Sequence, residues 1–175
     1  LAATRKLRTK EFDVSSAFST ADMHEEACIL APDCMGLSPG TLLRPRESPH
    51  GCKQSGRNFS IEFSAHLQSL GFAPLSSDPC VFVHDKDSDF AVLRIHVDDG
   101  ILCCSSADLE SRLVAGLRSK CELGCLRDLT QFLGLAVDHA PNGSISVHAA
   151  KCIRELATSF RVLDVRQTRT PAVVG

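Results

Sequence analysis

The 175-residue chain contains no tryptophan and no tyrosine, so its nine phenylalanines are the only residues of the Phe, Tyr and Trp class. It also has no apolar run of about 18 residues, so the sequence excludes a hydrophobic transmembrane helix. No secretory signal opens the chain. The first residue is Leu1 rather than Met, and we expect an excised piece of a longer polypeptide.

Regular cysteine spacing is missing as well. The nine cysteines form no Cys-x-x-Cys pairs, which disfavours a zinc site. We expect reduced, mostly buried thiols in an intracellular protein. A hydrophobic content of 43% and a charged content of 23% are typical of a globular domain with a substantial core.

The net charge of −2 gives no overall sign of a nucleic-acid-binding protein. Basic residues nevertheless cluster in three places, at 5–10, 44–57 and 151–175. Such clusters can contact phosphates, and they can equally be ordinary solvated faces. The sequence leaves both interpretations open.

The most informative stretch is 90–104, where two apolar runs flank Asp98-Asp99-Gly100. Asp-Gly between such runs predicts a β-hairpin whose turn lies at this triplet. Adjacent carboxylates repel each other at the rim of a hydrophobic sheet, and a divalent metal would offset that repulsion. The alternative is that Asp and Gly are simply good turn formers. Asp13 ends another short extended run, and its meeting with the hairpin would create the arrangement used in two-metal phosphoryl transfer.

Strand and helix patterns alternate along the chain. The segment 53–70 has one apolar face, followed by Gly71 where a helix cap belongs. A second helix should begin after a cap at Ser105 or Ser106. These patterns predict an α+β fold with helices on one face of a sheet. The expected strands are 10–14, 27–31, 42–43, 79–84, 90–97, 130–138 and 144–148, with polar turns at 85–89 and 141–143 and a last helix at 151–160.

A series of short motifs occurs in one order along the chain. They are Asp13-Val14-x-x-Ala17-Phe18, Gly51-x-Lys53-Gln54-x-x-Arg57, Ser69-Leu70-Gly71-Phe72, Ser77-Asp78-Pro79-Cys80, Val97-Asp98-Asp99, Phe132-Leu133-Gly134 and Thr170-Pro171. On these residues the chain resembles the reverse transcriptase of copia-type LTR retrotransposons, a part of their Pol polyprotein. The resemblance runs from about residue 10 to the last residue.

The resemblance implies a polymerase palm, in which an antiparallel sheet packs on helices, with partial fingers and the start of a thumb. It implies a single reverse-transcriptase domain fragment over 1–175. Palm and partial fingers would occupy about 9–138, and the palm edge and start of the thumb about 139–175.

The implied reaction is RNA-directed DNA synthesis, with two-metal nucleotidyl transfer to a primer 3′-hydroxyl. The resemblance assigns three catalytic aspartates that bind Mg²⁺ or Mn²⁺, four nucleotide-binding residues and three primer-positioning residues. Phe18 would be the sugar gate that leaves no room for a 2′-hydroxyl. In the same order, the three sets are Asp13, Asp98 and Asp99; Phe18, Lys53, Gln54 and Arg57; and Phe132, Leu133 and Gly134.

The implied partners are an RNA or DNA template with its primer, deoxynucleoside triphosphates, and the integrase and RNase H of the same Pol polyprotein. No membrane is expected, and the location would be a cytoplasmic virus-like particle or the nucleus. Several residues depart from the family pattern, and they support two alternatives, a catalytically inactive remnant and a nucleic-acid-binding module that keeps the palm fold. The departures are His50 and His96 for Tyr, Gly56 for Pro, Phe59 for Trp, Arg94 for an aliphatic residue and Gly124 for a Lys.

Overall fold

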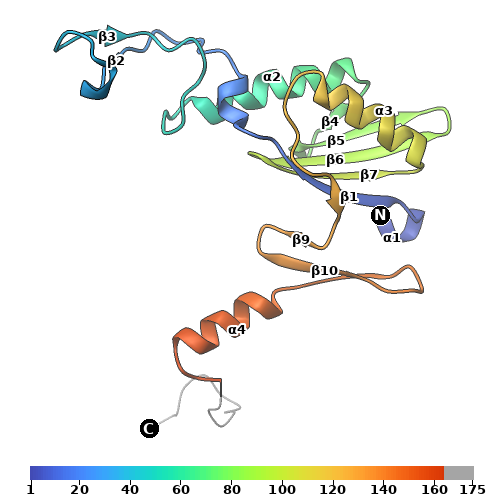
Figure 1. Ribbon diagram of the computed structural model, residues 1–175. Coiled ribbons are helices and arrows are strands. Elements are labelled where there is room, and N and C mark those ends of the chain that lie inside the picture. Colours follow the sequence, from blue (N-terminus) through green and yellow to red (C-terminus); the bar gives the residue numbers. More distant parts are fainter. Residues whose placement is uncertain (164–175) are drawn as a thin grey trace. The chain divides into compact units, whose positions relative to one another are not determined.

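The computed structural model describes residues 1–163 and divides into two compact units, Leu1–Leu129 and the residues from Thr130 onward (Figure 1). Each unit is described by itself. The Thr170-Pro171 motif and the basic residues Arg166 and Arg169 lie outside the described residues.

The first unit is built on a six-stranded sheet in the order β4-β5-β6-β7-β1-β8, and all neighbouring strands are antiparallel. The N-terminal strand β1 is inserted between β7 and β8, which brings the start of the chain against a hairpin from far along the sequence. The expected strands near 10–14, 79–84 and 90–97 are confirmed. The strands are β1 (Arg8–Asp13), β4 (Ala73–Leu75), β5 (Asp78–Lys86), β6 (Asp89–His96), β7 (Asp99–Cys104) and β8 (Arg127–Asp128).

Two helices, α2 (Ser55–Ser69) and α3 (Ala107–Arg118), cover one face of this sheet (Figure 1). The Ser106 hydroxyl caps α3 by accepting a hydrogen bond from the Leu109 N–H at 3.1 Å, as the sequence predicts. Gly71 follows α2 with φ +86°, the left-handed conformation expected of a C-terminal glycine. The core between helices and sheet contains Phe59, Phe63 and Leu67 of α2, Leu109, Leu113 and Leu117 of α3, and Phe82, Leu93 and Leu102 of the sheet.

The predicted position of the central hairpin turn is wrong. His96 pairs with Asp99, so the two-residue turn is Val97-Asp98, and Asp99 and Gly100 belong to β7. The requirement for glycine at position 100 is steric and does not come from the turn. A β-carbon there would lie 2.2 Å from the Cζ atom of Phe12, its cross-strand neighbour. The polar turn expected at 85–89 is likewise shorter, since Lys86 pairs with Asp89.

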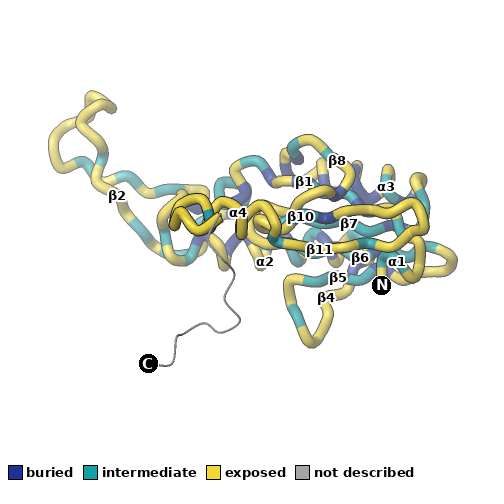
Figure 2. Tube along the Cα trace, turned by 90° about the horizontal axis from the view of Figure 1, so that it is seen from below, coloured by how far each residue is buried: buried dark blue, intermediate teal, exposed yellow. Residues whose placement is uncertain are grey.

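The rest of the first unit is short elements and an exposed arm. Helix α1 (Ala2–Arg5) ends before Arg8, which already belongs to β1. Strands β2 (Ile29–Leu30) and β3 (Leu42–Leu43) form a two-stranded arm whose surface is largely exposed (Figure 2). Two 3₁₀ helices complete this part, η1 (Ala17–Thr20) and η2 (Asp33–Met35).

The expectation of mostly buried thiols is wrong. All nine cysteines are free, yet only Cys104 and Cys121 are buried, and five are exposed. The exposed ones lie outside the core because most of them belong to the arm, to loops and to α4 of the second unit.

The second unit is a three-stranded sheet in the order β11-β10-β9 followed by a helix. The turn at Pro141-Asn142-Gly143 is confirmed: the Asn142 side chain accepts a hydrogen bond from the Ser144 N–H at 2.9 Å, and Gly143 has φ +84°. The strand expected over 130–138 is interrupted at Leu133-Gly134. The elements are β9 (Gln131–Phe132), β10 (Leu135–His139), β11 (Ile145–His148) and α4 (Ala150–Ser159). No helix in residues 1–163 is long and apolar enough to cross a membrane.

Candidate active site

Three aspartates from segments that are far apart in the sequence of the first unit lie near one another at one end of the central sheet. Asp13 is the last residue of β1 and lies directly opposite Asp99, the first residue of β7. The carbonyl oxygen of Asp98 accepts a hydrogen bond from the Val14 N–H at 2.7 Å. Direct cross-strand partners share a face of the sheet, so antiparallel pairing of β1 with β7 holds Asp13 beside the hairpin.

Burial and neighbouring carboxylates both disfavour the charged form of Asp99 at this corner. Burial is the main cause that raises the pKa of the Asp99 carboxyl, and the charges of Asp98 and Asp13 raise it further, while His96 acts in the opposite direction. Glu11 also raises the pKa of Asp99, by a smaller amount, although it is paired with Arg127 at 3.3 Å. A bound cation would relieve this repulsion.

The turn that carries Asp98 has an unfavourable backbone conformation. Val97 has φ +59°, and a left-handed conformation costs an L-residue about 1–2 kcal/mol, more so when it is β-branched. Val97 is 44% exposed, so burial of this residue does not repay the cost. The continuous pairing of β6 with β7 imposes the turn, and strain of this kind is typical of functional sites.

A third segment, residues 122–124, lines the same corner. Val14 forms an isolated bridge with Leu123, and the Gly124 N–H donates to the Asp13 carbonyl oxygen at 2.9 Å. A β-carbon at Gly124 would lie 2.1 Å from Oδ1 of Asp13. The sequence marks Gly124 only as a missing lysine; its contact with the Asp13 carboxylate depends on pairing between distant segments, for which the local sequence carries no signal.

Phe18 and the start of α2 lie together, beside Val97 of the hairpin turn. The half-buried Phe18 ring meets His50 edge-on, with ring centroids 4.8 Å apart. Its Cε1 atom would be 3.7 Å from a β-carbon at Gly56. Gln54 is the N-cap residue of α2, and its amide nitrogen lies 4.0 Å from the sulfur of Met23. Lys53 and Arg57 are exposed beside it.

Comparison with known proteins identifies the chain. A family model described as reverse transcriptase (RNA-dependent DNA polymerase) matches residues 1–174. The chain belongs to this family. The mixed α/β structure with one large antiparallel sheet is consistent with a reverse transcriptase domain.

The relatives of this reverse transcriptase chain are retrotransposon polyproteins, which confirms the predicted resemblance. It is 25% identical over 175 residues to the retrovirus-related Pol polyprotein from transposon TNT 1-94 of Nicotiana tabacum, which covers 98% of this chain and 13% of the relative. The corresponding protein from transposon RE2 of Arabidopsis thaliana is 22% identical over 173 residues, with 98% and 12% covered. The transposon Ty1-GR3 Gag-Pol polyprotein of Saccharomyces cerevisiae is 32% identical over 109 residues, 62% of this chain and 6% of the relative. The chain thus spans a small part of each relative.

A reverse transcriptase domain implies a divalent metal, and the donor chemistry here fits one. Carboxylate oxygens are the ligands that Mg²⁺ and Mn²⁺ prefer, and the charges of Asp13 and Asp98 both disfavour ionisation of Asp99 at this corner. Within residues 1–163, however, no three His, Cys, Asp or Glu side chains are already arranged to hold a metal ion. A cation would have to draw the carboxylates together.

The remaining candidate residues lie in the second unit of the reverse transcriptase chain. Phe132 pairs with Leu135 across a two-residue turn, in which Leu133 has φ +49° and Gly134 has φ +80°. Positive φ at both turn residues matches the twist of a tight hairpin. This geometry accounts for the glycine, and the primer-positioning role stays a prediction.

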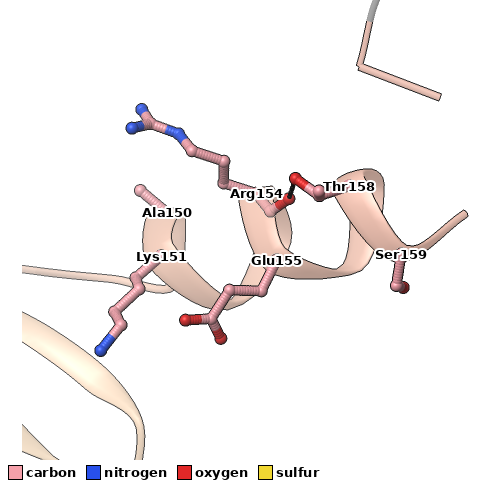
Figure 3. Close-up of a pocket in the computed structure, with 6 residues that line it drawn as sticks. All are labelled: Ala150, Lys151, Arg154, Glu155, Thr158 and Ser159. Atoms are coloured by element: carbon pink, nitrogen blue, oxygen red, sulfur yellow. Dashed lines mark hydrogen bonds between the residues drawn. The ribbon is translucent and has the colours of Figure 1, made fainter. Parts of the chain in front are cut away.

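A hollow of about 590 Å³ runs along α4 in the same unit (Figure 3). Lys151 and Glu155 extend to one side of the helix, whereas Arg154 extends to the other (Figure 3). The two basic side chains therefore diverge. They do not converge on one phosphate position, so this hollow on a single helix is not a built anion site.

Proposed function

We propose that this chain is the catalytic part of a reverse transcriptase and adds deoxynucleotides to a primer 3′-hydroxyl on an RNA or DNA template. The supporting observation is the register of β1 against β7, which sets Asp13 opposite Asp99 beside a strained Asp98 turn. In this proposal residues of about 9–138, which include the central sheet and its helices, are the palm with partial fingers, and residues of about 139–175 are the palm edge and the start of the thumb.

Each residue of the site has a proposed role. Asp13 and Asp98 are the principal ligands of the metal ions, Mg²⁺ or Mn²⁺, and Asp99 supports them. When bound, such ions lower the pKa of the attacking hydroxyl and stabilise the leaving phosphate. Asp98 lies in the two-residue turn and Asp99 is the first residue of β7, so the two carboxylates are held differently and do not contribute equally.

The nucleotide would lie between the hairpin and the start of α2. Phe18 is proposed to stack under the incoming deoxyribose and to exclude a 2′-hydroxyl. Gln54 is the proposed direct contact at the head of α2, and the exposed cations Lys53 and Arg57 attract phosphates. Template bases are read by pairing, so sequence-specific side-chain contacts are not required.

The proposed context is a retrotransposon Pol polyprotein with integrase and RNase H, in a cytoplasmic virus-like particle or in the nucleus. Two alternatives have their own observations. The Asp13 carboxylate against Gly124, without a closed ligand cluster in residues 1–163, favours an inactive remnant. The exposed Lys53 and Arg57 favour a nucleic-acid-binding module.

Primer extension by the full chain on an RNA template, with Mg²⁺ or Mn²⁺, tests the proposal. The decisive variant is Asp98→Asn. Its matched control is Asp87→Asn, which makes the same change in the turn of the β5–β6 hairpin. Extension that is lost in Asp98→Asn and kept in Asp87→Asn is the expected result.

Two further measurements separate the alternatives if no primer is extended. Mn²⁺ affinity is measured by water-proton relaxation, and template–primer affinity by fluorescence anisotropy. Asp98-dependent Mn²⁺ binding without extension identifies a catalytically silent palm. Template–primer binding that needs neither Asp98 nor metal identifies a nucleic-acid-binding module.

A further inference from the structure

An apolar cavity of about 280 Å³ lies between α2 and the strands β5 and β6, close to the Val97 turn. Its floor consists of four buried side chains, Phe59 and Phe63 from α2 with Phe82 and Ile95 from β5 and β6. We call this space the aromatic cavity. With Phe18, four phenyl rings line this one small volume, so its walls favour stacked or edge-on contacts with another ring.

Gly56 lines the aromatic cavity and is exposed to solvent, which places it at the mouth of the cavity. It lies in the first turn of α2, lines the cavity, and its backbone is not in the left-handed region. A β-carbon at this position would meet only Phe18 at an ordinary van der Waals distance of 3.7 Å. A larger side chain therefore fits there without a backbone clash and would occupy the mouth.

The size and lining of the cavity define the class of ligand. An apolar cavity of about 150 Å³ suffices to bind benzene, so the aromatic cavity has room for a two-ring molecule. Ser60 and Ser64 place hydroxyl groups along its α2 side, where one polar group of a ligand could be hydrogen-bonded. No Lys, Arg, Asp or Glu of residues 1–163 lines it, and His96 is the one basic side chain in this lining. A cation would lose its hydration without gaining an ion pair, and an anion would find no permanently charged partner.

We propose that the aromatic cavity is a binding site for an uncharged two-ring aromatic molecule with one hydrogen-bonding group, of which indole is the simplest example. The position of the cavity links its occupancy to the proposed nucleotide site. Phe18 forms one wall and Val97 another, so an occupant touches both the sugar-gate ring and the turn that carries Asp98. A bound molecule would hold Phe18 and the Val97 turn in place and weaken nucleotide binding. The effect on nucleotide binding rests on the proposed function, whereas the binding site itself does not.

The absence of Trp and Tyr makes the binding test direct. Indole fluorescence can be followed against a protein that has no indole or phenol fluorescence of its own. Titration of indole with the full chain is expected to give a saturable blue shift, because the ring leaves water for an apolar site.

Gly56→Leu is the decisive variant, and Ala65→Leu is its matched control. Both add the same side chain to α2, but Ala65 is exposed and does not line the cavity. Leu is a better helix former than Gly, so Gly56→Leu is expected to fold, which far-UV circular dichroism checks. Gly56→Leu should weaken indole binding at least about tenfold, as loss of a well-filled apolar pocket does, and Ala65→Leu should bind like the parent. Equal binding by parent and Gly56→Leu, or no saturable binding by the parent, overturns the site.

The consequence for nucleotide addition has a separate readout. In a preparation that extends a primer, indole should raise the KM for the deoxynucleotide and leave template–primer affinity unchanged. An unchanged KM at saturating indole overturns the coupling while the site stands. If the chain extends no primer, the proposed function fails, and the fluorescence titration still decides whether the cavity binds its ligand.

Discussion

Replacement of Gly100 by alanine should destabilise the protein, although alanine is intrinsically the better residue in a strand. A β-carbon at Gly100 would lie 2.2, 2.4 and 2.6 Å from three atoms of the Phe12 ring. Phe12 is 4% exposed and belongs to the main core, so its ring has no free space into which to move. The φ of Gly100 is not left-handed, and the backbone conformation itself is open to alanine.

The magnitude follows from two opposing effects. Overpacking of a well-filled core costs about 1–3 kcal/mol. Reduced backbone freedom in the unfolded chain returns about 0.5–1 kcal/mol when Gly becomes Ala. The central values of the two effects leave a fall of about 1 kcal/mol in the free energy of unfolding of Gly100→Ala. Urea unfolding followed by far-UV circular dichroism measures it, since the chain has no tryptophan to report by fluorescence.

A double-mutant cycle with Phe12→Leu tests the cause. Leucine lacks the far ring atoms that the new methyl would strike, so Gly100→Ala should cost little in that background. Gly116→Ala is a comparator, because its β-carbon would meet the flexible, half-buried side chain of Leu70 at 2.6 Å and replaces Gly within a helix. We expect it to be near neutral. A Gly100→Ala protein as stable as the parent, or an equal loss in both backgrounds, would refute the reasoning.

Three further predictions concern other groups. Burial and neighbouring carboxylates raise the pKa of Asp99, so its ionised form disfavours folding and the stability of the protein falls as pH rises through that pKa. Asp99→Asn should therefore have a higher melting temperature than the parent at neutral pH in metal-free buffer. The two melting temperatures should converge at a pH below the ordinary carboxyl range. Ser106→Ala removes the α3 cap and should lower the free energy of unfolding by about 1 kcal/mol in urea, and an unchanged midpoint would contradict the capping role. Burial raises the pKa of Cys103 to about 11 and of Cys104 to about 12, so at neutral pH a thiol reagent should modify the exposed Cys152 within the time that leaves both unlabelled, as mass spectrometry of peptides can show.

Much of the fold is predictable because local rules govern it. The apolar spacing of 53–70 predicts α2, and the serine before Leu109 predicts the cap of α3, since helix periodicity and capping act within a few residues. Pro141-Asn142-Gly143 predicts its turn for the same reason. The order of short motifs likewise indicates the family, because metal-dependent phosphoryl transfer requires particular residue types.

The site itself depends on contacts that no local pattern contains. Asp98-Asp99-Gly100 has the composition of a turn, yet the structure moves the turn to Val97-Asp98, because Asp99 must pair with His96 and Gly100 must admit the Phe12 ring. In the same way, only the structure shows that Gly124 lies against the Asp13 carboxylate and that a side chain there would contact it.

The sequence alone therefore determined the residue types, the helices and most strands, and the family to which the chain belongs. The tertiary structure alone decided the insertion of β1 between β7 and β8, the meeting of Asp13 with Asp99, and the cavity beside Phe18 and Val97. The physical reason is one of range. Propensity and periodicity act over a few neighbouring residues, whereas strand register and steric fit join segments that lie many residues apart, and only the packed chain brings those segments into contact.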